Sequence, residues 1–319
     1  MRIGIIGAPR LDERARVLDS WLHDVLSDDW ARIKDQWGLI GSPCEIGHAQ
    51  AWRFFLPAMY SARRLARRAA PADVFEVKSS LSRAPVLSGR VGCLISIDPH
   101  EALRDDLKGA WHPSLEGLQV EVVSPVDRES AHANIRAALD LLMCASPPSF
   151  DLVSGYCGAI SFVAPDQPAR QGFCVSTTSK SIPGLVYLSA VPTILSAESL
   201  VHESAHLKLG LHELDCSLFV DPKHLVRTPL RPDPRPVSGL LHQVWVLVHL
   251  QELYQDLLRD SSEIVRINFF KIRDRLSAHS RDLVEGLRVI HTARDSFTED
   301  GWRFVEALVQ RAETMCRAD

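Results

Sequence analysis

The sequence predicts an α+β protein that is predominantly helical and has a small β-sheet directly before a helix carrying a HExxH motif. Apolar residues recur at spacings of three and four over the first third of the chain, as helices with one buried face require. Candidate strands rich in β-branched residues then stand between Pro, Gly and Asp turns: DLVSGYCGAISFVAP, GFCVSTTS and GLVYLSAV. The HExxH segment follows the last of them.

The elements before residue 150 follow from the same patterns. Residues 11–70 are expected to be helical, and the apolar runs between residues 86 and 123 favour short strands. A helix is predicted over residues 128–143 and ends at ASPPS, because two prolines cannot continue a helical ladder. We therefore divide the chain into a mainly helical N-terminal region of unknown role (1–150) and a metal-binding region with the sheet, the HExxH helix and the C-terminal helices (151–319).

Capping residues and helix breakers set the expected bounds of the later helices. The HExxH helix is predicted to begin near Ser196, whose hydroxyl can accept from a free backbone N–H group, and to end near Gly210. A proline-rich connection, VRTPLRPDPRPVSG, leads to a second long helix over residues 239–258. Before the last helix, Ser296 and Glu299 have the spacing of a capping box.

The composition is that of a soluble globular protein. Hydrophobic residues make up 46% of the chain and charged residues 24%, and no apolar run approaches the roughly 18 to 20 residues that span a membrane. The first residues lack the long apolar core and cleavage site of a secretory signal, so a cytoplasmic location is expected. The seven cysteines include no CxxC pair and fit free thiols in a reducing compartment.

The charge pattern does not favour a nucleic-acid partner. The formal net charge is −4, and the basic cluster lies at helical spacing without interleaved aromatic residues, which is typical of a solvated helix face. The cluster consists of Arg63, Arg64, Arg67 and Arg68. Neither a nucleic acid nor a membrane is expected as a partner, and the sequence leaves the oligomeric state open.

The HExxH motif indicates a metal site. Residues four apart on a helix project from the same side, so His202 and His206 can direct both imidazoles at one ion. Glu203 lies next to that face, where the glutamate of zinc peptidases polarises a metal-bound water. The helix is otherwise rich in Leu, Val and Ala, where polar groups are costly unless they find partners. The alternative is a pair of histidines satisfied by ordinary hydrogen bonds.

Two histidines are candidates for a third ligand. His212 stands where the third histidine of a metzincin would be, but the glycine expected at position 209 is displaced to Gly210. His242 lies on the next predicted helix, and two packed helices can bring it to the metal, so we favour His242. His249 is seven residues further on and shares a face with His242, which fits either a role behind the metal ligands or simple packing.

The proline-rich connection could hold a carboxylate near the metal. Its prolines fix the backbone and would place Arg231 and Arg235 at low entropic cost. A guanidinium binds a carboxylate in bidentate fashion. The alternative interpretation is a surface linker in which Asp233 pairs with one of the arginines.

The run LVHESAH followed by PLRPDPRPVSGLLH resembles a bacterial family of HExxH-containing peptide-maturation proteins, encoded beside ribosomally synthesised peptide natural products. The resemblance spans about residues 173–250 and includes CVSTTSKSIPGLVYLS. It implies that His202, His206 and His242 are the metal ligands. Members of the family look like iron(II) and 2-oxoglutarate-dependent oxygenases that hydroxylate a β-carbon of a precursor peptide.

The same resemblance implies the roles of the other site residues. The cosubstrate and substrate would be bound by Arg231, Arg235, Ser176 and Thr178. Glu203 would orient the substrate or a ligand instead of acting as a general base.

Two other functions fit the same residues. The first is a zinc peptidase, in which Glu203 activates water and His242 completes a Zn²⁺ site. The second is a non-catalytic accessory protein that binds the precursor peptide and keeps a structural metal. Ligand identity separates these hypotheses only partly, because histidine suits both zinc and iron.

Overall fold

The computed structural model of the chain describes residues 86–88, 94–97, 120–121, 125–157, 159–165, 176–178, 185–189, 191–228 and 233–316. These residues divide into two compact units that alternate along the chain. One contains the strands up to Val123 and the segment Cys157–Ser189, and the other consists of Ser124–Tyr156 and Ala190–Asp319. The predicted helices of residues 11–70 and the cluster of Arg63, Arg64, Arg67 and Arg68 lie outside the described residues.

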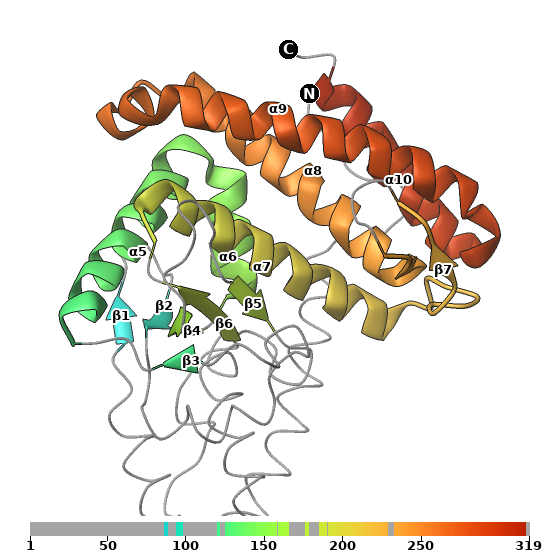
Figure 1. The fold of residues 1–319 in the computed structure, drawn as a ribbon, viewed down its shortest axis with the longest axis horizontal. Coiled ribbons are helices and arrows are strands. Elements are labelled where there is room, and N and C mark those ends of the chain that lie inside the picture. The colour runs from blue at the N-terminus through green and yellow to red at the C-terminus, as the bar shows by residue number, and fades with distance from the viewer. Residues whose placement is uncertain are drawn as a thin grey trace, which may run out of the picture. The chain divides into compact units, whose positions relative to one another are not determined.

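The first unit contains a mixed sheet. Its strands are β1 (Val86–Ser88), β2 (Leu94–Ile97), β3 (Val120–Glu121), β4 (Ala159–Pro165), β5 (Ser176–Thr178) and β6 (Leu185–Ser189). They are ordered β1-β2-β4-β6-β5, with β3 pairing with β4 (Figure 1). The prediction of a small sheet directly before the HExxH helix is confirmed.

The centre of this sheet is parallel and its edges are antiparallel. β4 pairs in parallel with both β2 and β6, whereas β1 and β5 pair antiparallel with their neighbours. In the central pair Ile160 lies opposite Val186 and Phe162 opposite Leu188, and all of these side chains are buried. A run of buried apolar residues is typical of a strand in a parallel arrangement.

The second unit consists mainly of helices. They are α5 (Pro125–Ala145), α6 (Pro147–Tyr156), α7 (Thr193–Asp215), α8 (Val237–Arg259), α9 (Glu263–Thr292), the 3-10 helix η4 (Arg294–Ser296) and α10 (Glu299–Cys316). Between α7 and α8 lies a short antiparallel pair, β7 (Leu225–Val226) with β8 (Arg235–Pro236). The predominantly helical character predicted from the sequence is confirmed for the described residues.

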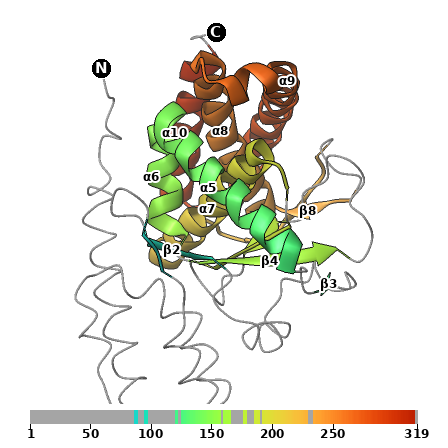
Figure 2. The same ribbon diagram turned by 90° about the vertical axis from the view of Figure 1, so that its left-hand side faces the viewer.

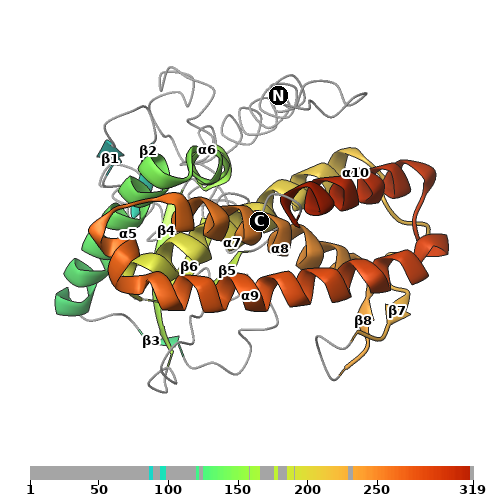
Figure 3. The same ribbon diagram turned by 90° about the horizontal axis from the view of Figure 1, so that it is seen from above.

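Helix α8 forms the core of this unit. It packs against α7 and α9, and also contacts α10 (Figures 1 and 3). Buried residues follow one another around α8 from Leu240 to Leu257, as expected of a helix covered on several sides. Helices α5 and α6 pack against α7 (Figure 2). The HExxH helix is thus held between the central helix and the α5–α6 pair.

The two prolines of ASPPS start a helix as well as ending one. Helix α5 ends at Ala145, close to the predicted end, but α6 begins at Pro147. Proline suits the first position of a helix, because its missing N–H would have no intrahelical partner there. The predicted strand over residues 151–165 therefore begins only at Ala159. The predicted boundary between residues 150 and 151 falls inside α6.

Both predicted ends of the HExxH helix were wrong. Helix α7 begins at Thr193, and the hydroxyl of Ser196 donates to the carbonyl of Val191 instead of capping the helix. At the other end the helix continues past Gly210 to Asp215. A glycine inside a helix costs roughly 1 kcal/mol, which the packing of the buried Gly210 can offset. The second long helix matches its prediction to within two residues at each end.

The last helix is capped by a different residue from the one predicted. Ser296 lies in η4, and the backbone N–H of Gly301 donates to Oγ1 of Thr298 at 3.0 Å. The capping box of Ser296 and Glu299 was therefore wrong, and Thr298 is the capping residue. Only glycine fits at position 301, because a Cβ there would collide with the backbone carbonyl of Leu218.

No helix in the described part of the chain combines the length and the apolar character needed to cross a membrane.

Candidate metal centre

The HExxH motif lies in the middle of α7, as predicted. His202 and His206 project from the same side of the helix, and their ring centroids are 4.9 Å apart with the rings edge to face. Burial lowers the pKa of His202 to about 4, although 39% of the side chain still reaches solvent. The imidazole is therefore neutral at physiological pH, and a neutral imidazole is the form that binds a metal.

Helix α8 brings His242 to the same place. The ring of His242 stacks against that of His206 with a centroid distance of 5.2 Å. The two Nδ1 atoms lie 3.0 Å apart. The three histidines that the sequence singled out thus form one continuous group, with His206 in the middle.

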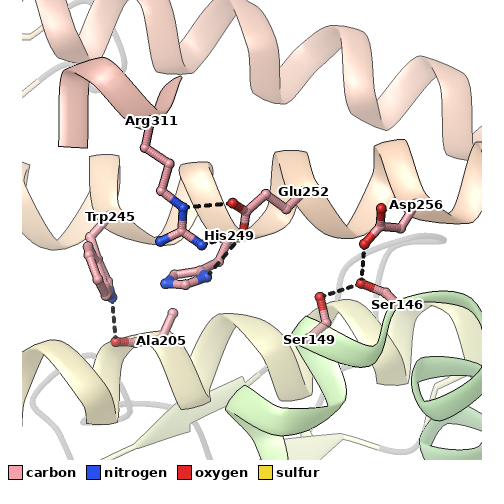
Figure 4. Close-up of polar contacts among 8 residues, drawn as sticks. All are labelled: Ser146, Ser149, Ala205, Trp245, His249, Glu252, Asp256 and Arg311. Carbon is pink, nitrogen blue, oxygen red and sulfur yellow. Dashed lines mark hydrogen bonds and ion pairs between the residues drawn. The ribbon is translucent and has the colours of Figure 1, made fainter. Parts of the chain in front are cut away.

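A hydrogen bond between α7 and α8 sets the register that makes this possible. Nε1 of Trp245 donates to the backbone carbonyl of Ala205 at 2.9 Å, and the bond is buried (Figure 4). Ala205 directly precedes His206, and Trp245 lies one turn after His242. Further along, the hydroxyl of Tyr254 donates to the carboxylate of Glu198, which shows that the two helices run antiparallel.

The ring nitrogens of this group include the kind of donor that transition metals bind. Nδ1 of His206 and Nδ1 of His242 lie at hydrogen-bond distance, 3.0 Å, so one of them carries the proton that the other accepts. Imidazole suits zinc and iron alike. Among the described residues, no group of three or more His, Cys, Asp or Glu side chains is already arranged to hold a metal ion. Metal binding would therefore require the three rings to rearrange.

Glu203 is the most enclosed member of the motif. Its side chain is only 3% exposed, and Oε1 lies 3.9 Å from Nε2 of His202. The carboxylate is therefore next to the histidines, but not open to bulk solvent. From this position Glu203 can orient the His202 ring. It could act as a general base only on a water molecule that enters the site.

A second carboxylate beside His202 was not predicted as part of the site. Glu198 lies one turn before His202 and binds Tyr254, Arg275 (3.1 Å) and His279 (3.6 Å). Burial alone would raise the pKa of Glu198, but His279, Arg275 and Tyr254 together lower it. Glu198 therefore stays ionised, and burial beside this carboxylate raises the pKa of Tyr254. The sequence feature that could have linked Glu198 to the site is its position four residues before His202, because residues at this spacing lie on the same face of a helix.

The other residue that the sequence analysis missed is Glu213. Its Oε1 lies 3.0 Å from Nε2 of His242, and each side chain is 13% exposed. Glu213 follows His206 by seven residues, which is close to two full turns, so both face α8. This signal became visible only once α7 was known to continue past Gly210.

His212 and His249 lie away from the three histidines. The ring of His212 stacks on Phe304 of α10 with a centroid distance of 5.0 Å. Because α7 continues without a turn at Gly210, His212 faces a different side of the helix from His206. The sharp turn of a metzincin is therefore absent from this helix. His249 belongs to a separate cluster on α8.

That cluster joins α8 to α10 (Figure 4). Arg311 donates to the carboxylate of Glu252 through Nε at 2.7 Å and also through Nη2, and Nδ1 of His249 lies 3.7 Å from the same carboxylate. Burial lowers the pKa of His249 to about 4. Burial would raise the pKa of Glu252, but His249 and Arg311 lower it to about 2. Lys208 lies over the Trp245 ring, and burial lowers its pKa to about 8.

A hydrogen-bond chain fastens the start of α6 to α8. The hydroxyl of Ser146 donates to Asp256 at 2.7 Å, and the hydroxyls of Ser146 and Ser149 share a hydrogen bond of 2.9 Å (Figure 4). Because α6 also packs against α7, this contact helps to hold the HExxH helix in place.

The predicted cosubstrate residues are spread over both units. Arg231 lies outside the described residues. Arg235 is half-buried in β8, where it pairs with Val226. Ser176 and Thr178 are half-buried in β5 of the sheet. Their association with the three histidines stays a prediction.

Comparison with known proteins adds no identification. No protein-family model matches the chain, and a search of curated proteins finds no similar sequence.

Proposed function

We propose that this chain is a metal-dependent enzyme that hydroxylates a β-carbon of a ribosomally synthesised precursor peptide, using iron(II) and 2-oxoglutarate. The observation that carries the proposal is the contact of His206 with both His202 and His242, at ring-centroid distances of 4.9 and 5.2 Å. Neutral imidazole nitrogens are ligands that suit both iron and zinc, and this contact brings three imidazoles from two helices together.

Each histidine has a distinct part in the proposal. His202 and His206 supply two nitrogens from one helix and His242 a third from its neighbour, which leaves positions on the metal for the keto acid and dioxygen. Iron, when bound, would supply the activation of dioxygen, in which one oxygen atom would enter the peptide C–H bond as C–OH and the other would convert 2-oxoglutarate to succinate and carbon dioxide. Glu203 would orient His202 or the substrate.

The cosubstrate and peptide would be held by residues outside the histidine group. Arg235, with Arg231, would bind the distal carboxylate of the keto acid, since a guanidinium grips a carboxylate with two hydrogen bonds. Ser176 and Thr178 would contact the cosubstrate or the peptide from β5, which is the last strand in the order of the described sheet. The resemblance of LVHESAH and PLRPDPRPVSGLLH to peptide-maturation proteins supports the peptide as substrate, and a cytoplasmic enzyme would have both cosubstrates at hand.

The test combines metal analysis with mass spectrometry. The full-length protein, purified without oxygen, is expected to bind one iron, and His206→Ala and His242→Ala to lose it. A precursor peptide encoded near the gene should then gain the mass of one oxygen atom when 2-oxoglutarate and oxygen are supplied. Full metal retention by both variants would refute the proposal.

A zinc peptidase is the second candidate, and Glu203 is the observation that favours it. Its Oε1 is 3.9 Å from Nε2 of His202, close enough to act on a water bound beside that histidine. In a peptidase Glu203→Gln would abolish activity, whereas in an oxygenase it would only slow the reaction. Cleavage of the peptide without 2-oxoglutarate would identify the peptidase. Metal binding with neither activity would instead identify an accessory protein that binds the peptide.

A further inference from the structure

A carboxylate on α7 contacts the histidine that α8 contributes to the candidate metal centre. Oε1 of Glu213 lies 3.0 Å from Nε2 of His242, and both side chains are largely buried. On the other edge of the same ring, Nδ1 of His242 lies 3.0 Å from Nδ1 of His206. The His242 ring therefore stands between a carboxylate and the second histidine of the HExxH motif.

This arrangement determines which nitrogen of His242 carries the proton. A carboxylate can only accept, so Nε2 of His242 is the N–H group that donates to Glu213. In a neutral imidazole the other nitrogen, Nδ1, then has a free lone pair. In the structure that lone pair accepts the hydrogen bond from Nδ1 of His206. A metal ion bound here would take the place of the His206 proton, and a carboxylate on the far nitrogen makes the His242 lone pair more basic.

The His242 ring lies between Glu213 and the HExxH helix's second histidine. It contacts His206 through one nitrogen and Glu213 through the other. Through this contact Glu213 can act on the candidate metal centre by holding His242.

We infer that Glu213 is a positioning residue, which holds His242 with its Nδ1 lone pair directed toward His206 so that the three histidines can bind one divalent metal ion. The inference rests on the proposed function, because it assigns a role at the same metal centre. It adds a carboxylate that HExxH alone does not specify.

The first measurement is metal affinity in solution. Metal-free full-length protein is titrated with Co²⁺ under argon, and the visible spectrum of the ion is followed. Glu213→Gln keeps the size of the side chain and removes its charge, so we expect Co²⁺ to bind 10- to 100-fold more weakly, about the effect of removing such a partner elsewhere. Glu213→Ala should weaken binding further.

A matched control is available on α8. Glu252 also lies beside a histidine, with Oε2 3.7 Å from Nδ1 of His249, and is a quarter exposed. Glu252→Gln makes the same chemical change away from the centre, so it should leave Co²⁺ affinity as in the unmodified protein. Equal weakening by both variants would show a general loss of structure and would overturn the inference.

The second measurement needs no metal. Nitrogen NMR of the imidazole rings reports which nitrogen of His242 is protonated, and we expect Nε2–H in the unmodified protein and a mixture of tautomers in Glu213→Ala. A merely structural role for Glu213 would not change this ratio. Protonation of Nδ1 in the unmodified protein would overturn the inference.

The outcomes also separate this inference from the proposed function. If the unmodified protein and His206→Ala bind Co²⁺ equally weakly, there is no metal centre and both proposals fail. If His206→Ala loses binding while Glu213→Gln binds as well as the unmodified protein, the metal centre stands and only the role of Glu213 is refuted.

Discussion

Nδ1 of His206 and Nδ1 of His242 lie 3.0 Å apart, although 36 residues separate them in the chain. Their proximity depends on the antiparallel packing of α7 and α8. That register is fixed on one side of the pair by the buried hydrogen bond from Trp245 to Ala205 and further along by the contact of Tyr254 with Glu198. Contacts that hold the two helices are therefore also contacts that shape the candidate site.

Trp245→Phe tests this dependence. The substitution keeps an aromatic ring over α7 and removes the N–H group that binds Ala205. We expect the free energy of unfolding to fall by more than the roughly 1 kcal/mol of one hydrogen bond, because the smaller ring also leaves a cavity, and Co²⁺ affinity to fall with it. Urea unfolding and metal titration measure the two effects.

Trp302→Phe is the matched control for that change. Nε1 of Trp302 donates to Glu306 in an exposed contact within α10, so this hydrogen bond does not join α7 to α8. We expect a loss of stability well below that of Trp245→Phe and no change in metal affinity. Equal losses in the two variants would contradict the role given to Trp245.

The sequence predicted the parts of the site that depend on one helix. His202 and His206 share a face whatever surrounds them, because four residues make one turn. We predicted His242 as the third ligand because we expected consecutive helices to pack against each other. Glu213 could not be predicted in the same way, because its contact with His242 needs both the antiparallel register and a helix that continues through Gly210.

The mixed sheet shows the same limit. Apolar, β-branched runs predicted β4 and β6, because strand formation is visible in local composition. Their parallel pairing depends on how the chain runs between the two strands, and the residues of the strands themselves do not indicate it. The start of α6 at Pro147 was missed because a proline that ends one helix and a proline that starts another look alike in sequence.

Thr298→Ala should destabilise the last helix. Its Oγ1 accepts from the N–H of Gly301 and donates to the carbonyl of Ser217, so it caps α10 and ties it to the segment after α7. Removing a threonine cap costs about 1 kcal/mol. Ser296→Ala, at the position that the sequence pattern favoured, should cost clearly less. Urea unfolding of both variants decides between them, and a larger loss for Ser296→Ala would contradict the assignment.

Glu252→Gln should change how stability responds to acid. The pKa of Glu252 is lowered from its ordinary 4.5 to about 2 by His249 and Arg311, against the opposing effect of burial. A carboxyl group with a lowered pKa stabilises the folded state above its unfolded pKa, and this contribution is lost as the pH falls from about 4.5 toward about 2. We expect Glu252→Gln to lose about 1–3 kcal/mol at pH 7 and to show a shallower decline between pH 4.5 and 3. An unchanged slope in urea unfolding would contradict this.

His249 is expected to act in a different pH range. Burial lowers its pKa from 6.5 to about 4, and Nε2 is enclosed without a hydrogen-bond partner among the described residues. Between pH 6.5 and 4 the unfolded chain therefore binds a proton that the folded chain refuses, so stability falls as the pH falls through this range. A shift of this size corresponds to about 3 kcal/mol at the low end.

His249→Asn removes that proton and keeps a donor near the position of Nδ1, beside Glu252. The variant will be less stable at pH 7, because a buried ring has been replaced by a smaller side chain. Its stability should nevertheless decline less between pH 6.5 and 4 than that of the unmodified protein, and the two curves should converge toward pH 4. The range differs from that of Glu252, whose contribution is lost only below about 4.5. Parallel curves from pH 6.5 to 4 would mean that His249 is protonated equally in both states, and that its enclosure between Trp245 and Glu252 has no energetic consequence.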